Sequence, residues 1–405
     1  MYSVKSENLR SSPVPQPSRS LPFSLGIELD GAGAHPASLT QAGVSLSESL
    51  SSNYLAKQGR CADRAGLSYL TLEDAPTAPD GTGARLDAGV RAAYLAPHTG
   101  AIGLVPVADV VYAEPFHLQG QLASLDILSG GRAGWVVRAQ EDALAAAAVS
   151  FVAAAGDEIP AEASEVVEVV RLLWDSWQDN AVVRDITRGA YFDRERLYHV
   201  RYEGTRFSLT GPAINPRPTQ GHPVVFGRDG DLELEKLDAV LVSGEGTEKR
   251  VIDIRERAGD STPVILELEV ILDSRGEKAA RRLAALDSHS PWESHRSRFV
   301  GSPSDLIDYL IDASDRVDGV RLLPAVLDLE LPELENIVLP GLRRREAFTS
   351  PVRGKTLRET LGLHRPSNTF EVRASEQQER ERDASPRSGG SEQLDSTDKR
   401  EVTQS

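Results

Sequence analysis

The residues best suited to chemistry are charged side chains that directly follow short apolar segments. They occur as Glu28 and Asp30, Glu73 and Asp74, Asp109, Arg138, and the loop 227–231, which contains Gly227 and Arg228. If the segments are parallel strands, their carboxyl ends meet at one edge of a sheet, where α/β proteins bind ligands. Carboxylates and guanidinium groups gathered there would hold a polar ligand through charge-assisted hydrogen bonds. Asp74 can also be interpreted as a helix cap, and the pattern leaves both roles open.

Other classes of site are disfavoured. The eight histidines show no spacing typical of a metal site on one helix face. Cys61 is the only cysteine, so no internal disulfide can form, and no histidine lies nearby in the sequence to activate it as a nucleophile. The chain contains no Gly-x-Ser-x-Gly elbow and no Walker loop, and the segment 31–33 lacks the third glycine of a dinucleotide-binding fingerprint.

The overall charge limits the partners. The formal net charge is −16 and the isoelectric point is near 5.1, which disfavours nucleic acid and anionic membranes. An anionic ligand must therefore be held by a local arrangement. The first 20 residues lack the apolar core of a signal peptide, and the longest apolar stretch, 143–155, is too short to span a bilayer. With a single cysteine, these features predict a cytoplasmic protein.

Strand-like and helix-like segments alternate along the chain. Near-continuous apolar runs predict buried parallel strands, at 24–29, 69–72, 102–107, 134–137, 224–226, 238–242, 264–268 and 319–323. Helical periodicity, proline and glycine signals predict helices between them, at 45–65, 85–96, 115–128 and 161–177. Eight strands predict a closed (β/α)₈ TIM barrel, with a doubly wound open sheet as the alternative.

The prediction divides the chain into three parts. Residues 1–22 form a disordered N-terminal tail, residues 23–365 form the barrel, and residues 366–405 form a disordered C-terminal tail rich in polar residues. A segment with short aromatic pieces, 185–218, interrupts the alternation. We interpret it as a hairpin insertion between the fourth helix and the fifth strand.

Three longer runs resemble a known family. They are YAEPFHL (112–118) continuing into ASLDILSGGRAGW (123–135), EVVRLLWDSW (168–177), and VDGV (317–320) followed by LPGLRRR (339–345) and LRETLGL (357–363). They resemble the bacterial luciferase-like flavin-dependent monooxygenases, in the nitrilotriacetate and alkanesulfonate monooxygenase branch. The resemblance spans about 25–363. We expect Glu114-Pro115 and the run 129–135 to be structural, with Gly130 and Gly131 providing backbone freedom.

The resemblance implies chemistry that the residues alone do not reveal. Reduced FMN, supplied by a separate flavin reductase, would react with O₂ and oxygenate a small organic substrate. A deazaflavin replaces FMN in part of the wider family. The alternative is a non-catalytic paralogue that serves as a binding or partner subunit, and a barrel enzyme with unrelated chemistry is a third hypothesis. Whether the chain forms a homo-oligomer is left open.

The resemblance assigns flavin-binding roles to five residues of this chain. They are Asp74 after the second strand, Asp109 after the third, Arg138 after the fourth, and Gly227 and Arg228 in the phosphate loop after the fifth.

Other positions depart from the family. Hydroxyl, imidazole and phenol groups of the relatives are replaced by Ala139, Gly156 and Pro160, and the phosphate loop is short and carries Asp229 and Asp231. Carboxylates close to a phosphate oppose its binding. We therefore expect weak binding of FMN, or a ligand that has no phosphate.

Overall fold

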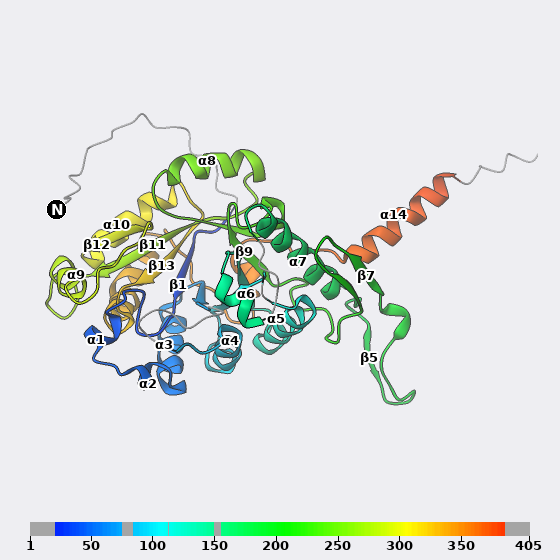
Figure 1. Cartoon of the computed structure of the whole chain (residues 1–405), viewed down its shortest axis with the longest axis horizontal. Coiled ribbons are helices and arrows are strands. Elements are labelled where there is room, and N and C mark those ends of the chain that lie inside the picture. The colour runs from blue at the N-terminus through cyan, green and yellow to red at the C-terminus, as the bar shows by residue number, and fades with distance from the viewer. Residues whose placement is uncertain (1–20, 75–83, 112, 150–154, 385–405) are drawn as a thin grey trace, which may run out of the picture.

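Eight parallel strands close into a barrel in the computed structural model (Figure 1). The structure describes residues 21–74, 84–111, 113–149 and 155–384. β1 pairs with both β2 and β13, and β10 pairs with β11, so the sheet closes and the TIM barrel is confirmed over the open sheet. In order around the barrel, the strands are β1 Ser24–Glu28, β2 Tyr69–Leu72, β3 Gly103–Asp109, β4 Gly134–Arg138, β9 Val224–Arg228, β10 Ala239–Val242, β11 Val264–Leu272 and β13 Gly319–Pro324.

Helices surround this barrel on the outside (Figure 1). They are α1 Ser38–Ala42, α2 Leu46–Ser49, α3 Ser52–Ala65, α4 Ala88–Leu95, α5 Pro115–Ser129, α6 Ala143–Val149, α7 Glu158–Asp175, α8 Thr247–Ala258, α9 Ala279–Asp287, α10 Pro303–Ser314, α11 Leu327–Glu333 and α12 Leu339–Arg344. A further strand, β12 Ser297–Gly301, pairs with the last residues of β11 beyond the end of β10.

One crossover has no α-helix. Between β9 and β10, the chain forms only the 3₁₀ turn η3 Leu234–Lys236. The turn packs directly on the barrel, because a Cβ atom at Gly227 would come within 2.7 Å of Leu237 and 3.1 Å of Leu232. This is the loop that the family resemblance assigns to phosphate.

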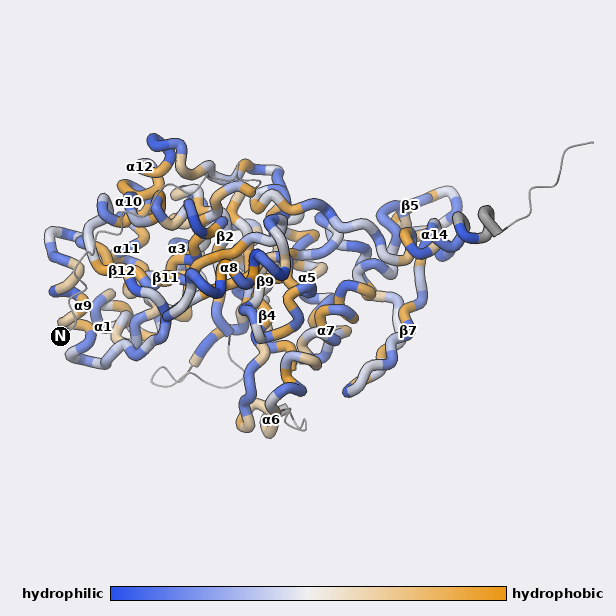
Figure 2. Tube along the Cα trace, turned by 90° about the horizontal axis from the view of Figure 1, so that it is seen from above, coloured by the Kyte–Doolittle hydropathy of each residue, from blue (hydrophilic) through white to orange (hydrophobic). Residues whose placement is uncertain are grey.

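The barrel interior below the mouth is apolar. Figure 2 shows hydrophobic residues concentrated along the barrel strands. A short helix, α13 Leu357–Thr360, closes the end of the barrel opposite the mouth. Its Leu357 packs with inward-facing strand residues, among them Tyr69, Val105, Val136 and Phe226. In the described part of the chain, α13 thus blocks this end, and the carboxyl ends of the strands form the open end of the barrel.

Glu114-Pro115 and the run 129–135 have the structural role predicted for them. The Glu114 carboxylate caps α5 by accepting hydrogen bonds from the backbone N–H groups of Phe116 and His117, and Pro115 occupies the first helical position. The helix ends at Gly130, and Gly131 follows with φ +86°. The buried Arg132 donates to the carbonyls of Ser129 and Ile102, which fixes the turn into β4.

The predicted insertion consists of two antiparallel hairpins that project from one side of the barrel (Figure 1). They are β5 Val182–Asp185 with β6 Ala190–Phe192, and β7 Val200–Glu203 with β8 Ser208–Gly211. The predicted boundary at 365 needs a correction, because residues 369–384 form helix α14 Thr369–Ala384. Phe370 stacks on Tyr198 at 4.9 Å, so the insertion holds the start of this helix. Residues 1–20 of the predicted N-terminal tail lie outside the part of the chain that the structure describes.

Candidate functional site at the barrel mouth

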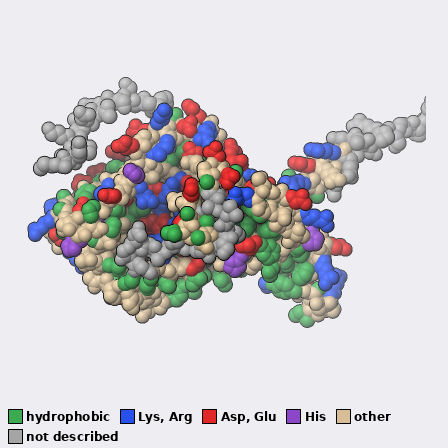
Figure 3. Space-filling model, viewed as in Figure 1, with side chains coloured by type: hydrophobic (Ala, Val, Ile, Leu, Met, Phe, Trp, Pro, Cys, Tyr) green, Lys and Arg blue, Asp and Glu red, His purple; other side chains and the backbone are tan. Residues whose placement is uncertain are grey.

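A buried arginine organises the mouth of the barrel. Arg321 on β13 is fully buried, and its Nε donates to the Thr71 hydroxyl at 2.9 Å. Its Nη1 donates to Glu267 at 2.7 Å, and its Nη2 donates to Glu28 and to Glu73, the latter at 3.2 Å. One guanidinium therefore contacts three carboxylates that come from three different strands or strand ends. Figure 3 shows acidic and basic side chains gathered in the hollow of the mouth.

Two of these carboxylates have additional cations. Glu267 also accepts from Nε and Nη2 of Arg228, at 3.1 and 2.9 Å. Although burial opposes ionisation, Arg321 and Arg228 hold the pKa of Glu267 down at about 2. Glu73 lies 3.5 Å from Arg138, and Arg321 and Arg138 likewise outweigh burial and lower its pKa.

Glu28 is in a different electrostatic position. Its carboxylate meets only the shared Arg321 among the described residues. Burial raises the pKa of Glu28 to about 8, and the neighbouring Glu73 and Asp30 add to this rise while Arg321 opposes it.

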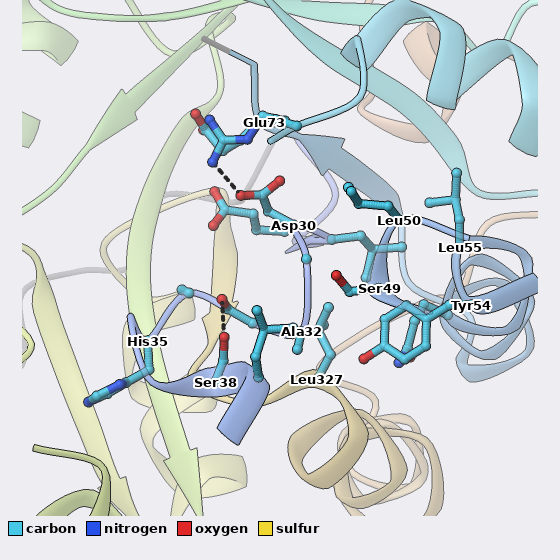
Figure 4. Close-up of a pocket in the computed structure, with 18 of the residues that line it drawn as sticks. Asp30, Ala32, His35, Ser38, Ser49, Leu50, Tyr54, Leu55, Glu73 and Leu327 are labelled. Carbon is cyan, nitrogen blue, oxygen red and sulfur yellow. Dashed lines mark hydrogen bonds and ion pairs between the residues drawn. The ribbon is translucent and has the colours of Figure 1, made fainter. Parts of the chain in front are cut away.

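Beside this charged layer lies a cavity of about 360 Å³. Figure 4 shows Glu73 and Asp30 at one end of it, and Leu50, Leu55 and Tyr54 toward another. Its charged lining residues are Glu28, Asp30, Glu73, Arg85, Arg91 and Arg296. The volume lies within the range of about 300–1,000 Å³ that is typical of small-molecule sites.

A second cavity, of about 860 Å³, extends from the ends of β3 and β4 along α5. Asp74, Asp109 and Arg138 all line it, so the fold brings three of the five predicted residues together. Arg138 Nε lies 3.4 Å from Asp109. The remaining atoms, Asp109 Oδ1 and Arg138 Nη2, are buried and have no hydrogen-bond partner among the described residues. Burial raises the pKa of Asp109 to about 6, against the effect of Arg138.

Asp74 has features of both roles that its sequence left open. One carboxylate oxygen accepts a hydrogen bond from the backbone N–H of Ala88, the first residue of α4, at 2.8 Å. The same side chain lines the larger cavity. It therefore orients the start of α4 at the cavity wall.

The other two predicted residues lie elsewhere. Gly227 faces the η3 turn, and Arg228 turns into the barrel toward Glu267. At the tip of the loop, Asp229 pairs with Arg257 at 3.1 Å, and burial raises the pKa of Asp231 to about 6. Within the described part of this loop, the only cation is thus already engaged.

Sequence reasoning missed the centre of the network. Glu267 and Arg321 lie inside apolar runs that predict strands, whereas only residues at the strand ends were considered as candidate site residues. The available signal was a charged residue with apolar neighbours on both sides inside a strand, which occurs twice in ILELEV (265–270) and once in GVRLL (319–323). Among the described residues, no group of histidine, cysteine and carboxylate side chains has the arrangement of a metal site.

A family model described as luciferase-like monooxygenase matches residues 34–310, more than half of the chain. This chain belongs to the luciferase-like monooxygenase family. It is 27% identical to N-acetyl-S-(2-succino)cysteine monooxygenase of Bacillus subtilis (strain 168) and 26% identical to nitrilotriacetate monooxygenase component A of Aminobacter aminovorans. Each alignment covers 86% of this chain and 98% of the relative.

A solved structure extends the likeness to the fold. Riboflavin lyase, crystallised with a modified FMN and riboflavin, superposes with a TM-score of 0.74 at 22% identity, over 84% of this chain and 96% of that one. This likeness concerns the fold, and the family match with the curated relatives makes the protein a monooxygenase of the luciferase-like family. The curated relatives are named as enzymes, which favours an enzyme over the non-catalytic alternative.

The luciferase-like site of this chain fits one part of a flavin and not another. The unpaired Arg138 donor and Asp109 acceptor suit the edge of a flavin ring, which alternates carbonyl acceptors with an N–H donor. The loop after β9 does not suit a phosphate, because Arg228 is paired with Glu267 while Asp229 and Asp231 remain at its tip.

Among the described helices, none has the length and apolar character that crossing a membrane requires.

Proposed function

We propose that this family member is an FMN-dependent monooxygenase. It takes reduced FMN from a separate flavin reductase and, with O₂, oxygenates a small organic substrate. When bound, the reduced flavin would supply the electrons that activate O₂. The single cysteine supports a cytoplasmic location.

The observation that supports this proposal is the buried, unpaired pair Asp109 Oδ1 and Arg138 Nη2. Buried polar atoms without a partner are costly, so a ligand that pairs with them gains binding free energy. They lie at the carboxyl ends of β3 and β4, the face on which barrel enzymes bind their ligands. Asp74 places α4 beside them, and residues of α5 line the same cavity.

Binding of reduced flavin tests the proposal. Anaerobic calorimetric titration should show binding of reduced FMN that Arg138→Gln weakens by at least about tenfold, the loss expected for one charged hydrogen bond. Arg188→Gln, which alters an exposed arginine between β5 and β6, is the matched control and should change the affinity less than about twofold. Equal affinities for the wild-type and Arg138→Gln proteins would refute the proposed ring contact.

The phosphate can be tested separately. Because the loop after β9 has no available cation, reduced riboflavin should bind within about threefold of reduced FMN, a difference below 1 kcal/mol. Binding of FMN at low-micromolar affinity together with much weaker binding of riboflavin would show that the phosphate is well held. A reduced deazaflavin titrated in the same way tests the alternative cofactor.

We also propose that the chain self-associates. Val90, Leu128 and Ile214 line the larger cavity and are 66%, 69% and 77% exposed. Apolar side chains clustered at this level of exposure are typical of interaction surfaces. Sedimentation velocity on wild-type protein and Leu128→Glu tests this, since a monomeric wild type would rule it out.

A further inference from the structure

The carboxylates of the mouth are unequally neutralised. Glu267 contacts Arg321 and Arg228, and Glu73 contacts Arg321 and Arg138. Among the described residues, the only cation that Glu28 contacts is Arg321, which it shares with the other two carboxylates. Of the three carboxylates around Arg321, Glu28 therefore gains least from being charged.

The groups that face Glu28 come from every neighbouring element. Asp30 lies beyond its own strand end, Glu73 follows β2, and Glu267 lies on β11, while Arg321 on β13 and Arg296 before β12 are the cations. Glu28 shares Arg321 with Glu73 and Glu267, and the negative charges of Asp30 and Glu73 disfavour a further charge on Glu28. The rise in the pKa of Glu28 to about 8, caused first by burial, agrees with this arrangement.

The smaller cavity, which Glu28 lines, has donors left for a ligand. The Nε atom of Arg91 is buried without a hydrogen-bond partner among the described residues. The Arg296 guanidinium lies 3.7 Å from Glu267, longer than a hydrogen bond, and its side chain is 33% exposed. Arg85 and Arg91 both pair with Asp30, at 2.6 and 3.2 Å. If Glu28 is neutral, the guanidinium groups that line the cavity, those of Arg85, Arg91 and Arg296, outnumber the two lining carboxylates that remain charged, Asp30 and Glu73.

The rest of this cavity is apolar. Leu50, Leu55 and Leu327 line it together with the ring of Tyr54 (Figure 4). A charged end and an apolar end within about 360 Å³ favour a small amphipathic molecule.

We propose that Glu28 holds a proton at neutral pH and donates a hydrogen bond to the carboxylate of a small organic acid bound in this cavity. Arg296 and Arg91 carry the charge of the bound anion, and the leucines pack on its apolar body. This inference rests on the proposed monooxygenase function and deepens it by naming the substrate class, small organic carboxylates.

Calorimetry with hexanoate on the full-length protein tests the inference. Between pH 7 and pH 9 the affinity of the wild type should fall by about tenfold, because Glu28 ionises with a pKa of about 8. In Glu28→Gln the affinity should stay constant over the same range, because the amide remains a neutral donor. Hexanamide, which has no charge, should bind at least about tenfold more weakly than hexanoate to the wild type at pH 7.

Two further variants provide the controls. Arg296→Gln should weaken hexanoate binding at least about tenfold. Glu269→Gln removes another buried carboxylate of the mouth whose Oε1 has no described partner, so it should leave the pH profile unchanged. A Glu28→Gln protein that retains the wild-type profile, or a wild type that does not bind hexanoate, would overturn the inference.

Infrared difference spectroscopy of the wild type keeps the inference testable if Glu28→Gln does not fold. A carboxylic acid carbonyl band should disappear as the pH rises through about 8. The absence of this carbonyl band at pH 7 would overturn the inference. None of these measurements uses flavin, so a failure of reduced FMN to bind would refute the proposed function independently.

Discussion

At the closed end of the barrel the interior is filled by apolar side chains, whereas at the mouth it is filled by ion pairs. Tyr69, Phe226 and Leu357 occupy the closed end, and their packing is the same kind as that of any protein core. At the mouth, Arg321 and Glu267 are equally buried but charged. The stability of the mouth, unlike that of the closed end, depends on the pairing of positive and negative side chains, because a buried charge is tolerated only when it is paired. The apolar end supports the fold, and the charged end is where a ligand can alter the balance.

Removal of Arg321, the central cation of the mouth, should have the largest effect on stability. Arg321→Met keeps the volume but leaves three carboxylates without their shared partner, so we expect a loss of about 3–5 kcal/mol in the free energy of unfolding. Phe226→Leu is the matched change at the closed end and should cost less than about 1.5 kcal/mol. Urea denaturation measures both. Similar losses in the two variants would show that the mouth is held by packing and not by charge.

A backbone position near the closed end should give the next largest effect. Gly131 has φ +86°, and a Cβ atom there would come within 2.8 Å of Thr356, just before α13. Gly131→Val should lower the free energy of unfolding by on the order of 1–3 kcal/mol. Gly130→Ala has open space around its Cβ and should cost less, so it separates backbone strain from collision. An unchanged melting temperature in Gly131→Val would contradict the prediction.

The pH dependence of stability should distinguish two carboxylates of the mouth. Glu28 has a raised pKa, so its contribution is complete below about 4.5 and is lost as the pH rises through about 8. Between pH 7 and 9, this loss corresponds to about 1.4 kcal/mol. Glu267 has a lowered pKa, so its contribution is complete above about 4.5 and is lost as the pH falls toward 2. Urea denaturation across pH should lose its alkaline slope in Glu28→Gln and its acid slope in Glu267→Gln. Persistence of the alkaline slope in Glu28→Gln would mean that another group titrates.

The smallest effect is expected in the loop after β9. Asp229→Asn removes a half-exposed ion pair with Arg257, so stability should change by less than about 1 kcal/mol. The released arginine and the lost negative charge should still improve binding of reduced FMN by about two- to fivefold without changing binding of riboflavin. Equal changes for both flavins would show that the loop does not face the phosphate.

Much of the fold could be predicted because its signals are local. The apolar runs of the eight barrel strands, the Glu114-Pro115 cap of α5 and the glycines after it all act over a few residues. The positions of Asp74, Asp109 and Arg138 at strand ends could be predicted for the same reason, and their role in flavin binding stays a prediction. The helix α14 was missed because its residues are polar and its start is held by Tyr198, far away in the sequence.

The sequence by itself determined the number and order of the eight barrel strands and the family. Only the tertiary structure decided which charges meet. Thr71 and Arg321 are 250 positions apart, and closure of the barrel between β1 and β13 brings them into contact. It also decided that Arg228 points to Glu267 and not to a phosphate. Side chains on strands alternate between two faces, but which strands become neighbours depends on how the whole sheet closes.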